Sequence, residues 1–498
     1  MAPSLVITGA KIVELESGSI LENTDVWIAH ERIVALQPTG SPPPFDGPVE
    51  RLSFENCLVL PGMVNCHTHS GSALLRGTNP GLPCDLYVME AMARRAPRDL
   101  RHVKISILLQ AMEMLKCGIT SVIDHFRQGA IPTPEALATV FESYEQAGMR
   151  AAVAPMFDDR RYIDSLPLDQ SRLPRTVHER WNAMQPPARE DYFAAMAEIV
   201  AESRKHQRMQ VLLGLEGPPR STPRSFEMAG EFAARHGIGL HTHLLEVKTQ
   251  ALMATEYSGS LVAYLDRFGL VGPKSSFAHF IWFNERDAEL AVDRHLNIVH
   301  NPVSNLLFGS GLQPTAKLLA AGLNVALGSD GAGGQPISLF EQAKFAMLLS
   351  RISEQDCDKW ITARQALRMA TINGGRAFGE PAALGAIRVG AHADIAIIKL
   401  TSQTYRPMGD IWNHLVMYET GTNVHTVIVG GNVVVYGGRC TNLNEADLLA
   451  EADELALQGH AINAPYLENA RAERSIFQPL ILEALRESMP MERFARLS

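Results

Sequence analysis

Residues 58–69 read Leu58-Val59-Leu60-Pro61-Gly62-Met63-Val64-Asn65-Cys66-His67-Thr68-His69, and the rest of the chain is understood most easily from this stretch. It begins as an apolar run typical of a β-strand and ends in two histidines separated by one residue. Side chains two residues apart on a strand point to the same side, so His67 and His69 can direct both imidazoles at one ion. Neutral imidazole suits Zn²⁺ or Fe²⁺. One such pair is weak evidence alone, and a metal site requires further ligands downstream.

The length and composition describe an ordinary globular protein. The chain has 498 residues, of which 46% are hydrophobic and 20% charged, and a net charge of −9. This length accommodates one large α/β barrel with a smaller domain. No basic stripe stands out, so we expect no nucleic-acid partner. We see no signal peptide and no apolar run of the ~18 residues that span a bilayer, so we expect a cytoplasmic protein without membrane contact.

The six cysteines are scattered along the chain, mostly in apolar surroundings. We expect free, buried thiols in a reducing compartment. Cys66 adjoins His67, but strand alternation places its side chain on the opposite face. We therefore do not count Cys66 among the metal ligands.

Short strand-like segments occur at both ends of the chain. Between residues 4 and 56 they are separated by Gly9, Gly18 and a run of three prolines, and similar segments recur within 394–436. One β-sandwich assembled from residues 1–57 and 386–442 explains both flanks.

The middle of the chain, residues 58–385, alternates strands with helices. Such alternation predicts a (β/α)8 TIM barrel, whose active site lies at the carboxyl ends of its strands. The eight predicted strands are Leu58–Cys66, Ile119–Ile123, Arg150–Ala154, Val211–Leu215, a strand beginning at Gly239–Leu240, Ser276–Ala278, Asn297–Val299 and Asn324–Leu327. Residues 443–498 read as a charged helical extension that packs on the surface or at a subunit contact.

Two long connections interrupt this alternation. Residues 76–102 follow the first predicted strand, and residues 157–190, rich in Asp, Arg and Pro, follow the third. Both should overhang the mouth of the barrel, where they could act as substrate lids.

Polar residues follow the later strands at the point where each strand ends. His241, His243 and Glu246 follow the fifth strand, His279 ends the sixth, and Asp330 follows the eighth. A single histidine in an apolar strand is usually a core residue. Its repetition at several strand ends, together with His67 and His69, predicts a metal site.

These motifs resemble those of the amidohydrolase superfamily, specifically its deaminase and chlorohydrolase branch, which includes guanine, cytosine and S-adenosylhomocysteine deaminases and s-triazine hydrolases. The resemblance covers nearly the whole chain. It rests on PGMVNCHTHS, GITSVIDH, HTHLLE, AHFIW, HNPVSNLLFGSG, LGSDG and LGAIRVGAHADIAII.

The resemblance implies a role for each matching residue. It implies that His67, His69, His243 and Asp330 hold one divalent metal ion, Zn²⁺ or else Fe²⁺, and leave a position open for water. Zinc can lower the pKa of such a water towards ~7. Glu246 would transfer protons, and His279 would hydrogen-bond the attacking water or the developing oxyanion. Ser304 and Asn305 would form part of the pocket wall.

Two further residues could alter the metal site. Relatives with two metals use a carboxylated lysine or a glutamate at the fourth strand; this strand has no lysine, and we read Glu216 as structural. His241 lies on the same face as His243 but deeper, so we expect it to pack inside the barrel or to support a ligand.

The chain also departs from the family pattern. Where purine-directed relatives carry a histidine after the fourth strand, it reads Gly217-Pro218-Pro219-Arg220, and Leu306-Leu307-Phe308 is wholly apolar. We therefore expect a more apolar pocket, with a contact from Arg220 and a less secure assignment to nucleosides or guanine. His125, at the end of the second strand, is a further candidate for substrate contact, as are Arg127 and Arg160-Arg161, although these arginines could equally be solvated.

We predict a hydrolase that deaminates an N-heterocyclic small molecule, or displaces chloride or an alkylamine from it. The same centre could instead cleave an amide, carbamate or urea bond. A non-catalytic scaffold would lack one of the metal ligands or the proton-transferring acid. Here all four ligands, Glu246 and His279 are present. Relatives are commonly homo-oligomers, so we expect a homodimer or larger assembly.

Overall fold

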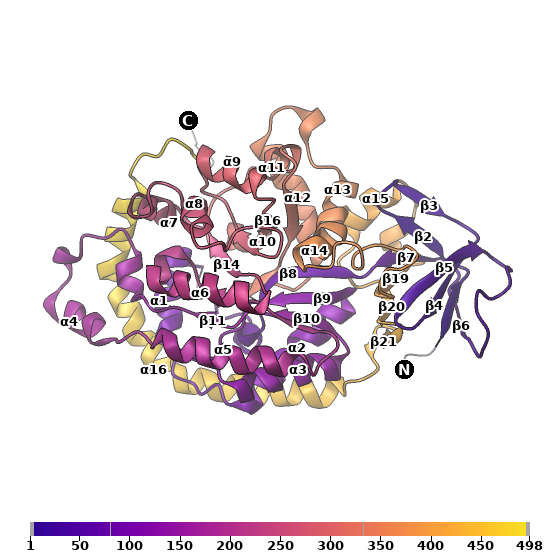
Figure 1. The fold of residues 1–498 in the computed structure, drawn as a ribbon, viewed down its shortest axis with the longest axis horizontal. Coiled ribbons are helices and arrows are strands. Elements are labelled where there is room, and N and C mark those ends of the chain that lie inside the picture. Colours follow the sequence, from indigo (N-terminus) through magenta and orange to yellow (C-terminus); the bar gives the residue numbers. More distant parts are fainter. Residues whose placement is uncertain (1–3, 80, 332, 495–498) are drawn as a thin grey trace.

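The computed structural model describes residues 4–79, 81–331 and 333–494. Its largest part is a barrel of parallel strands surrounded by helices (Figure 1). The barrel strands are β8 (Met63–His69), β9 (Ile119–Asp124), β10 (Arg150–Val153), β11 (Met156–Phe157), β12 (Met209–Val211), β13 (Gly214–Leu215), β14 (His241–Leu244), β15 (Ser276–His279), β16 (Asn297–His300), β17 (Asn324–Leu327) and β18 (Asp330–Gly331).

These strands occupy eight positions around the barrel, because β10 and β11, β12 and β13, and β17 and β18 each follow one another at a single position. The pairing runs in parallel through β12, β10, β9, β8 and β18, and through β14, β15, β16 and β17. A bridge between Leu213 and Leu240 joins the two sheets, and β18 pairs with β8 through Asp330 and Thr68. The predicted TIM-barrel fold is confirmed.

Helices cover the outside of the barrel and its mouth (Figure 1). Several end where a glycine adopts a left-handed conformation, as α3 does at Gly148 (φ 84°) and α6 at Gly237 (φ 73°). The helices are α1 (Cys84–Met92), α2 (Leu100–Lys116), α3 (Pro134–Ala147), α4 (Arg175–Ala183), α5 (Arg189–Ser203), α6 (Pro223–His236), α7 (Lys248–Leu252), α8 (Leu261–Asp266), α9 (Glu285–Asp293), α10 (Pro302–Leu307), α11 (Thr315–Ala320), α12 (Leu339–Ser353), α13 (Ala363–Ala370), α14 (Ile372–Ala377), α15 (Ile411–Asn413) and α16 (Glu445–Leu485).

The two ends of the chain meet in a small β domain beside the barrel (Figure 1). One sheet has the order β5-β4-β1-β6, and the other β22-β21-β20-β19-β7-β2-β3. The strands are β1 (Leu5–Thr8), β2 (Lys11–Glu14), β3 (Ser19–Leu21), β4 (Thr24–Ala29), β5 (Arg32–Pro38), β6 (Glu50–Ser53), β7 (Cys57–Pro61), β19 (Ile395–Lys399), β20 (Val424–Val429), β21 (Asn432–Tyr436) and β22 (Arg439–Cys440). The predicted assembly from both flanks is therefore confirmed.

The first predicted barrel strand needs a correction. Residues 58–66 belong to two strands, because β7 ends at Pro61 and β8 begins at Met63, with Gly62 between them. β7 pairs with β19 and β2 in the β domain, and the barrel begins only with β8. A Cβ at Gly62 would lie 2.3 Å from Thr120 Oγ1, so this passage between the domains requires glycine.

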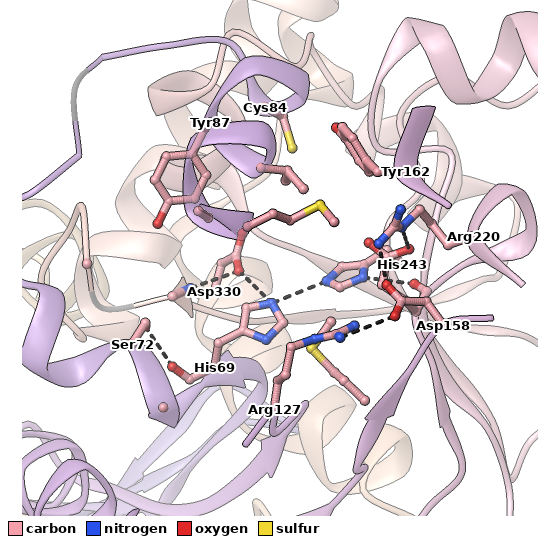
Figure 2. Close-up of a pocket in the computed structure, with 18 of the residues that line it drawn as sticks. His69, Ser72, Cys84, Tyr87, Arg127, Asp158, Tyr162, Arg220, His243 and Asp330 are labelled. Atoms are coloured by element: carbon pink, nitrogen blue, oxygen red, sulfur yellow. Dashed lines mark hydrogen bonds and ion pairs between the residues drawn. The ribbon is translucent and has the colours of Figure 1, made fainter. Parts of the chain in front are cut away.

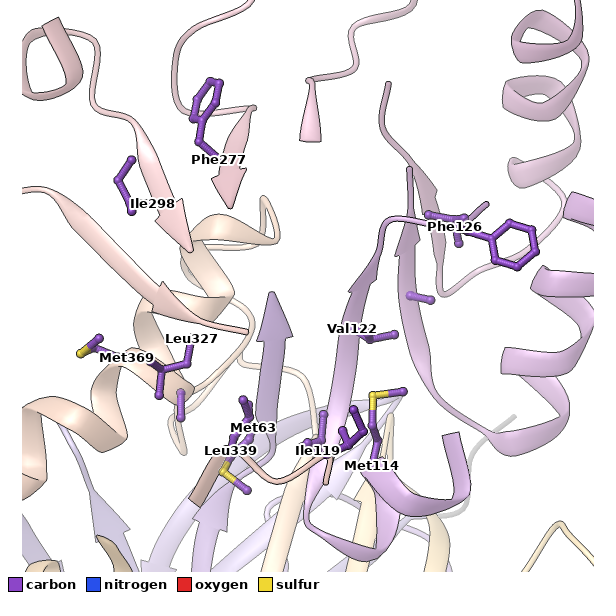
Figure 3. Packing of buried hydrophobic residues seen from close by; sticks show 14 of the residues in the cluster. Met63, Met114, Ile119, Val122, Phe126, Phe277, Ile298, Leu327, Leu339 and Met369 are labelled. Carbon is purple, nitrogen blue, oxygen red and sulfur yellow. The ribbon is translucent and has the colours of Figure 1, made fainter. Parts of the chain in front are cut away.

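A continuous apolar core holds the barrel and its helices together (Figure 3). Met63 of β8, Ile119 of the adjacent β9, Leu327 of β17 on the other side of β8, and Met369 of α13 are all buried in it. Burial of apolar surface stabilises the folded state by about 25 cal/mol per Å². It is therefore the main contribution to the stability of the barrel, whose strand ends carry the site.

Helix α16 lies along the outer surface of the barrel and contacts α1 and α2 (Figure 1). Its contact with α1 places it behind residues 76–102, of which residue 80 lies outside the described part. None of the helices in the described ranges combines the length and the apolar character needed to cross a membrane.

Candidate metal centre and active site

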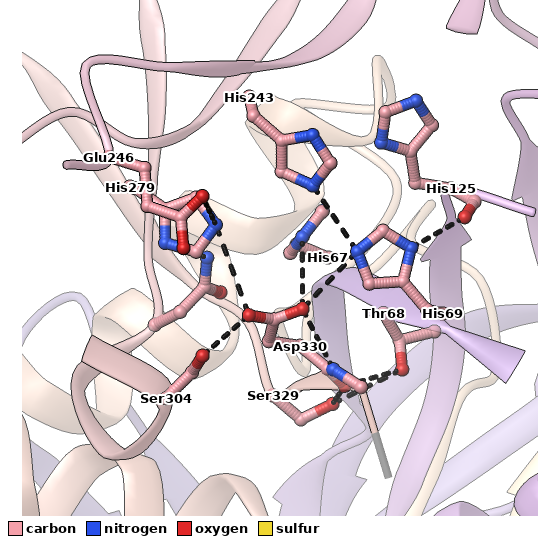
Figure 4. Close-up of polar contacts among 12 residues, drawn as sticks. His67, Thr68, His69, His125, His243, Glu246, His279, Ser304, Ser329 and Asp330 are labelled. Carbon is pink, nitrogen blue, oxygen red and sulfur yellow. Dashed lines mark hydrogen bonds and ion pairs between the residues drawn. The ribbon is translucent and has the colours of Figure 1, made fainter. Parts of the chain in front are cut away.

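Three imidazoles meet at the carboxyl ends of β8 and β14 (Figure 4). Each uses its Nδ1 atom in a hydrogen bond to the surrounding protein. His67 Nδ1 lies 2.8 Å from His241 Nε2, His69 Nδ1 lies 2.7 Å from the carbonyl oxygen of His125, and His243 Nδ1 lies 2.9 Å from that of Glu216. These contacts orient the rings and leave each Nε2 facing the centre, the usual arrangement around a metal.

Asp330 completes the group from the eighth barrel position. Its Oδ1 atom lies 3.5 Å from His67 Nε2 and 3.3 Å from His69 Nε2, and the Nε2 atoms of His69 and His243 are 3.2 Å apart. Asp330 has φ 59°, a left-handed conformation that is uncommon outside glycine. Strained backbone of this kind is concentrated at functional sites.

The protonation states suit metal ligands. Burial lowers the pKa of His67 to about 4 and holds that of His243 well below its ordinary value. Burial acts in the same direction on His69, but contact with Asp330 outweighs it and raises the pKa. Burial alone would raise the pKa of Asp330; close contact with His67 and His69, and attraction to them, hold it well below the usual range. The Asp330 carboxylate can therefore be presented together with the neutral imidazoles of His67 and His243.

The residues themselves fit a metal ion. The Nε2 atoms of His67 and His279 are buried and have no hydrogen-bond partner among the described residues. Leaving buried polar atoms unpaired costs about 1–3 kcal/mol each, a cost that a bound cation would remove at His67. Two sets with ligand atoms within 4.8 Å of one another could hold such an ion: His67, His69, His125 and His243, and His67, His279 and Asp330.

Glu246 and His279 lie on the cavity side of this group. His279 Nε2 is 3.9 Å from Glu246 Oε2 and 3.9 Å from Asp330 Oδ2. Burial raises the pKa of Glu246, and the Asp330 carboxylate acts in the same direction against the influence of His279. A carboxyl group with a raised pKa can accept and return a proton near neutral pH.

Ser304 and Asn305 do not form the pocket wall, contrary to the sequence-based expectation. Both are buried behind the site, in α10. Ser304 Oγ donates to Asp330 Oδ2 over 2.5 Å, and Asn305 Oδ1 lies 2.9 Å from His279 Nδ1. Their contacts instead position the side chains of Asp330 and His279, and neither lines the cavity.

A cavity of about 980 Å³ opens above these groups (Figure 2). His69, His243, Glu246, His279 and Asp330 line its floor. Residues from both long connections, 76–102 and 157–190, line its upper part, as predicted for segments that overhang the mouth. Whether they open and close as lids stays a prediction.

Arg220 lines this cavity, but other side chains occupy its guanidinium. It forms an ion pair with Asp158, lies 3.5 Å from Glu216 Oε2, and stacks over the Tyr162 ring at 4.6 Å (Figure 2). His125 lies beneath the cavity, with its ring centroid 4.8 Å from that of His243 and its Nε2 atom 3.2 Å from the Gly214 carbonyl oxygen. A direct substrate contact by either residue stays a prediction.

Of the other ambiguous residues, His241 and Cys66 lie outside the set that lines the cavity, whereas Glu216 belongs to it. His241 bridges His67 and Ser276 Oγ, which lies 2.7 Å from its Nδ1, so it supports a candidate ligand as expected. Glu216 has its carboxylate beside Arg220, consistent with a structural role. Cys66 points away towards the carbonyl of Gly374.

Sequence reasoning missed several cavity residues. Cys84, Asp85 and Tyr87 come from α1, and Asp158 and Tyr162 come from residues 157–190, the long connection after the third predicted strand. No regular spacing links them to the strand ends. Only the length of the two connections indicated that such residues would reach the site.

A barrel with this centre at the carboxyl ends of its strands defines a metal-dependent hydrolase, and the comparisons name the family. The chain belongs to the amidohydrolase family, whose model matches residues 58–434. It is 30% identical to a 5'-deoxyadenosine deaminase of Methanosarcina mazei, over 81% of this chain and 87% of that protein. It is 28% identical to a 5-methylthioadenosine/S-adenosylhomocysteine deaminase of Pelotomaculum thermopropionicum, over 91% and 98%.

Its fold also matches the crystal structure of a zinc-bound adenosine deaminase from Xanthomonas campestris. The TM-score is 0.80 at 24% identity, over 92% of this chain and 99% of that one. The predicted membership of the deaminase and chlorohydrolase branch is confirmed. Both relatives compared by sequence are named for adenine nucleosides.

Proposed function

We propose that this protein is a zinc-dependent aminohydrolase that replaces the exocyclic amino group of an adenine nucleoside by a carbonyl and releases ammonia. The supporting observation is the arrangement of three imidazole Nε2 atoms and one carboxylate beneath Glu246 and His279. The names of the two relatives compared by sequence support the assignment of a substrate that contains an adenine ring and a ribose.

We assign one zinc ion to His67, His69, His243 and Asp330. These donors leave room for a further ligand, as catalytic zinc sites require. Zinc bound there would supply Lewis acidity, which makes a water molecule a competent nucleophile near neutral pH. The zinc in the Xanthomonas campestris structure supports this metal over iron.

Glu246 carries the proton in this mechanism. The water oxygen bonds to the ring carbon that bears the amino group, and the proton it loses passes to the Glu246 carboxylate. The same carboxyl group then delivers that proton to the amino nitrogen, the carbon–nitrogen bond breaks, and ammonia leaves. The proton that remains on the new oxygen moves to the adjacent ring nitrogen, which leaves a carbonyl group on the ring. General acid–base transfer of this kind contributes typically 10²–10⁴-fold to the rate.

His279 assists from the adjacent position. Asn305 Oδ1 accepts a hydrogen bond from Nδ1 of His279, and this contact directs Nε2 into the space between Glu246 and Asp330. From there Nε2 can hold the water or the oxygen on which negative charge develops.

Aromatic side chains form a wall suited to a flat ring. The Tyr87 and Phe308 rings lie 5.0 Å apart in the cavity lining, at 43° to one another, and Leu307 lies beside them. The apolar residues at 307 and 308 that the sequence drew attention to therefore face the proposed substrate.

Ammonia release tests this proposal. Zinc-loaded protein is offered adenosine, 5'-deoxyadenosine, aminopyrimidines, pterins and amino-triazines, with Glu246→Gln as the control. Release from the adenine nucleosides by the wild type alone supports the assignment. Silence across the panel refutes deamination and favours an amide, carbamate or urea bond, or chloride, as the group cleaved by the same centre.

The oligomeric state stays a prediction. We infer a homo-oligomer from the superfamily resemblance, with the exposed side chains of α16 as the candidate contact. Sedimentation of the zinc-loaded protein as a monomer would contradict it.

A further inference from the structure

Beyond α16 the chain continues as a tail, residues 486–494, that returns to the active-site end of the barrel. The described part of the tail ends beside α9 (Figure 1). The family model matches residues 58–434, so this segment lies beyond the part of the chain that the model covers. Its contacts fall on the loops that carry Glu246 and His279, the two groups assigned to proton transfer and to the attacking water.

Arg493 joins the tail to the loop that follows His279. Its Nε atom donates to the carbonyl oxygen of Ile281 over 2.8 Å, and its Nη2 atom donates to that of Phe283 over 3.3 Å. The guanidinium also lies over the Phe283 ring, 4.7 Å from its centre. Because the donors of a guanidinium group are held in a rigid fork, one side chain fixes two carbonyl groups of the same loop.

The tail packs closely against this loop and against a second one. Gly311, in the loop after α10, has φ 123°, and a Cβ there would lie 3.2 Å from both Arg493 Cβ and Ile281 Cγ2. The next residue, Leu312, donates its backbone N–H to the carbonyl oxygen of Arg493 over 2.7 Å. The close approach therefore requires glycine, and backbone as well as side-chain contacts fix the position of Arg493.

The loop held by Arg493 begins with strained backbone. His279 has φ 77° and Phe280 has φ 48°, two consecutive left-handed residues of which neither is glycine. Such conformations cost free energy and persist only where surrounding contacts impose them. On one side, the N–H groups of Phe280 and Ile281 donate, each over 2.9 Å, to the carbonyl oxygens of residues 244 and 245. On the other side, the contacts come from Arg493.

The end of α16 is tied to the loop that carries Glu246. Lys248 Nζ donates to the carbonyl oxygen of Leu485, the last residue of α16, over 2.8 Å. Lys248 is buried, follows Glu246 by two residues, and places its ammonium group 5.7 Å from the centre of the Trp282 ring. A cation at the C-terminus of a helix interacts favourably with the helix dipole. The end of α16 and the tail therefore contact both loops that bear catalytic groups.

We propose that the tail positions His279 for the reaction, through Arg493. The hydrogen bonds to the carbonyls of Ile281 and Phe283 hold the loop in the conformation that keeps the left-handed backbone at His279. They thereby keep His279 Nε2 directed towards Glu246, 3.9 Å from its Oε2 atom. This inference rests on the proposed function, in which His279 holds the water or the developing oxyanion. Arg493 does not line the cavity, so it is a positioning residue that acts through His279.

Amide hydrogen exchange tests this contact independently of catalysis. The variant is Arg493→Gln, and the matched control is Arg486→Gln, which removes the same charge from an exposed side chain of the same segment. In the zinc-loaded proteins, the amides of residues 280–283 should exchange roughly tenfold faster or more in the variant, because hydrogen bonds from charged donors are the stronger ones. The control should exchange like the wild type. Unchanged exchange in Arg493→Gln overturns the proposal.

Kinetics separate positioning of His279 from a general loss of structure. Arg493→Gln should lower kcat roughly ten- to a hundredfold and leave KM unchanged, because a misplaced catalytic group weakens the transition state alone. In a His279→Asn background the same substitution should have no further effect, since a residue that acts only through His279 then has nothing to position. An equal loss in both backgrounds overturns the proposal.

The two measurements also distinguish this proposal from the proposed function. Exchange at residues 280–283 that depends on Arg493, in a wild type that releases no ammonia, would refute deamination and keep the role of the tail in holding His279. Ammonia release that is the same in Arg493→Gln and the wild type would refute the positioning role and keep the deaminase.

Discussion

Asp85 provides a quantitative test of how α1 is held over the active site. Its carboxyl group is buried, and Thr249 Oγ1 and Tyr162 Oη lie 3.0 Å and 3.4 Å from its oxygens. Burial raises its pKa from 3.8 to about 7; the nearby Glu246 adds to this, while the hydrogen bonds from Thr249 and Tyr162 oppose it. The folded protein therefore keeps this proton at pH values where the unfolded chain has lost it.

The sign and size of the effect follow from linkage. Because the folded state binds the extra proton, stability falls as the pH rises from 3.8 to about 7 and is constant above that range. At about 1.36 kcal/mol per pKa unit, the total loss is roughly 4 kcal/mol, an upper bound because water can enter when α1 loosens. Replacing Asp85 by Asn keeps an oxygen that accepts from Thr249 and Tyr162 but removes the charged form.

We expect the loss to appear as opening of α1, because this helix lies at the cavity mouth. In the wild type, amide hydrogen exchange in residues 84–92, corrected for the intrinsic effect of pH, should become faster between pH 5 and pH 8. In Asp85→Asn it should stay constant and slower at pH 8. Equal pH dependence in the two proteins would refute the reasoning, and a variant less protected at pH 5 would show that the amide does not reproduce the native contacts.

The remaining predictions concern the metal centre and its supports. Glu246→Gln should keep its zinc and lose about 10²–10⁴-fold in kcat; metal analysis and ammonia release check this, and a fully active variant would refute the proton-transfer role. Asp330→Ala should contain less zinc than the wild type after dialysis, and unchanged metal content would exclude it as a ligand. Gly328→Ala would place a Cβ 2.3 Å from Asn301 Oδ1 and 2.8 Å from His67 Cβ, so we expect weaker zinc retention. A Gly328→Ala protein that retains zinc like the wild type would show that this part of the barrel can adjust.

Much of the architecture could be read from local pattern. Strand–helix alternation predicted the barrel, and the short apolar segments at both ends predicted their association in one β domain. The sequence predicts one strand where the structure has β7 and β8, because an apolar run of residues looks the same whether it forms one strand or two. Its division depends on the contact between Gly62 and Thr120, which belong to different strands.

The clustering of the residues named for the metal and for proton transfer could be predicted, because each lies at or just after the carboxyl end of a barrel strand and the topology brings all such positions to one end. The supporting contacts could not. Ser304 and Asn305 were assigned to the pocket wall, but the direction of α10 turns them towards Asp330 and His279. A short helix after a strand has no spacing rule that specifies which of its faces meets the site.

The sequence by itself determined the fold class and the candidate ligands, because hydrophobic periodicity and strand-end position are local properties. Only the tertiary structure decided which group lies against Nδ1 of each imidazole and which side chains contact Arg220. These features depend on which side chains from distant segments come within hydrogen-bonding distance. That proximity is set by packing of the whole chain, and charge and hydrogen bonding act only after packing has brought the groups together.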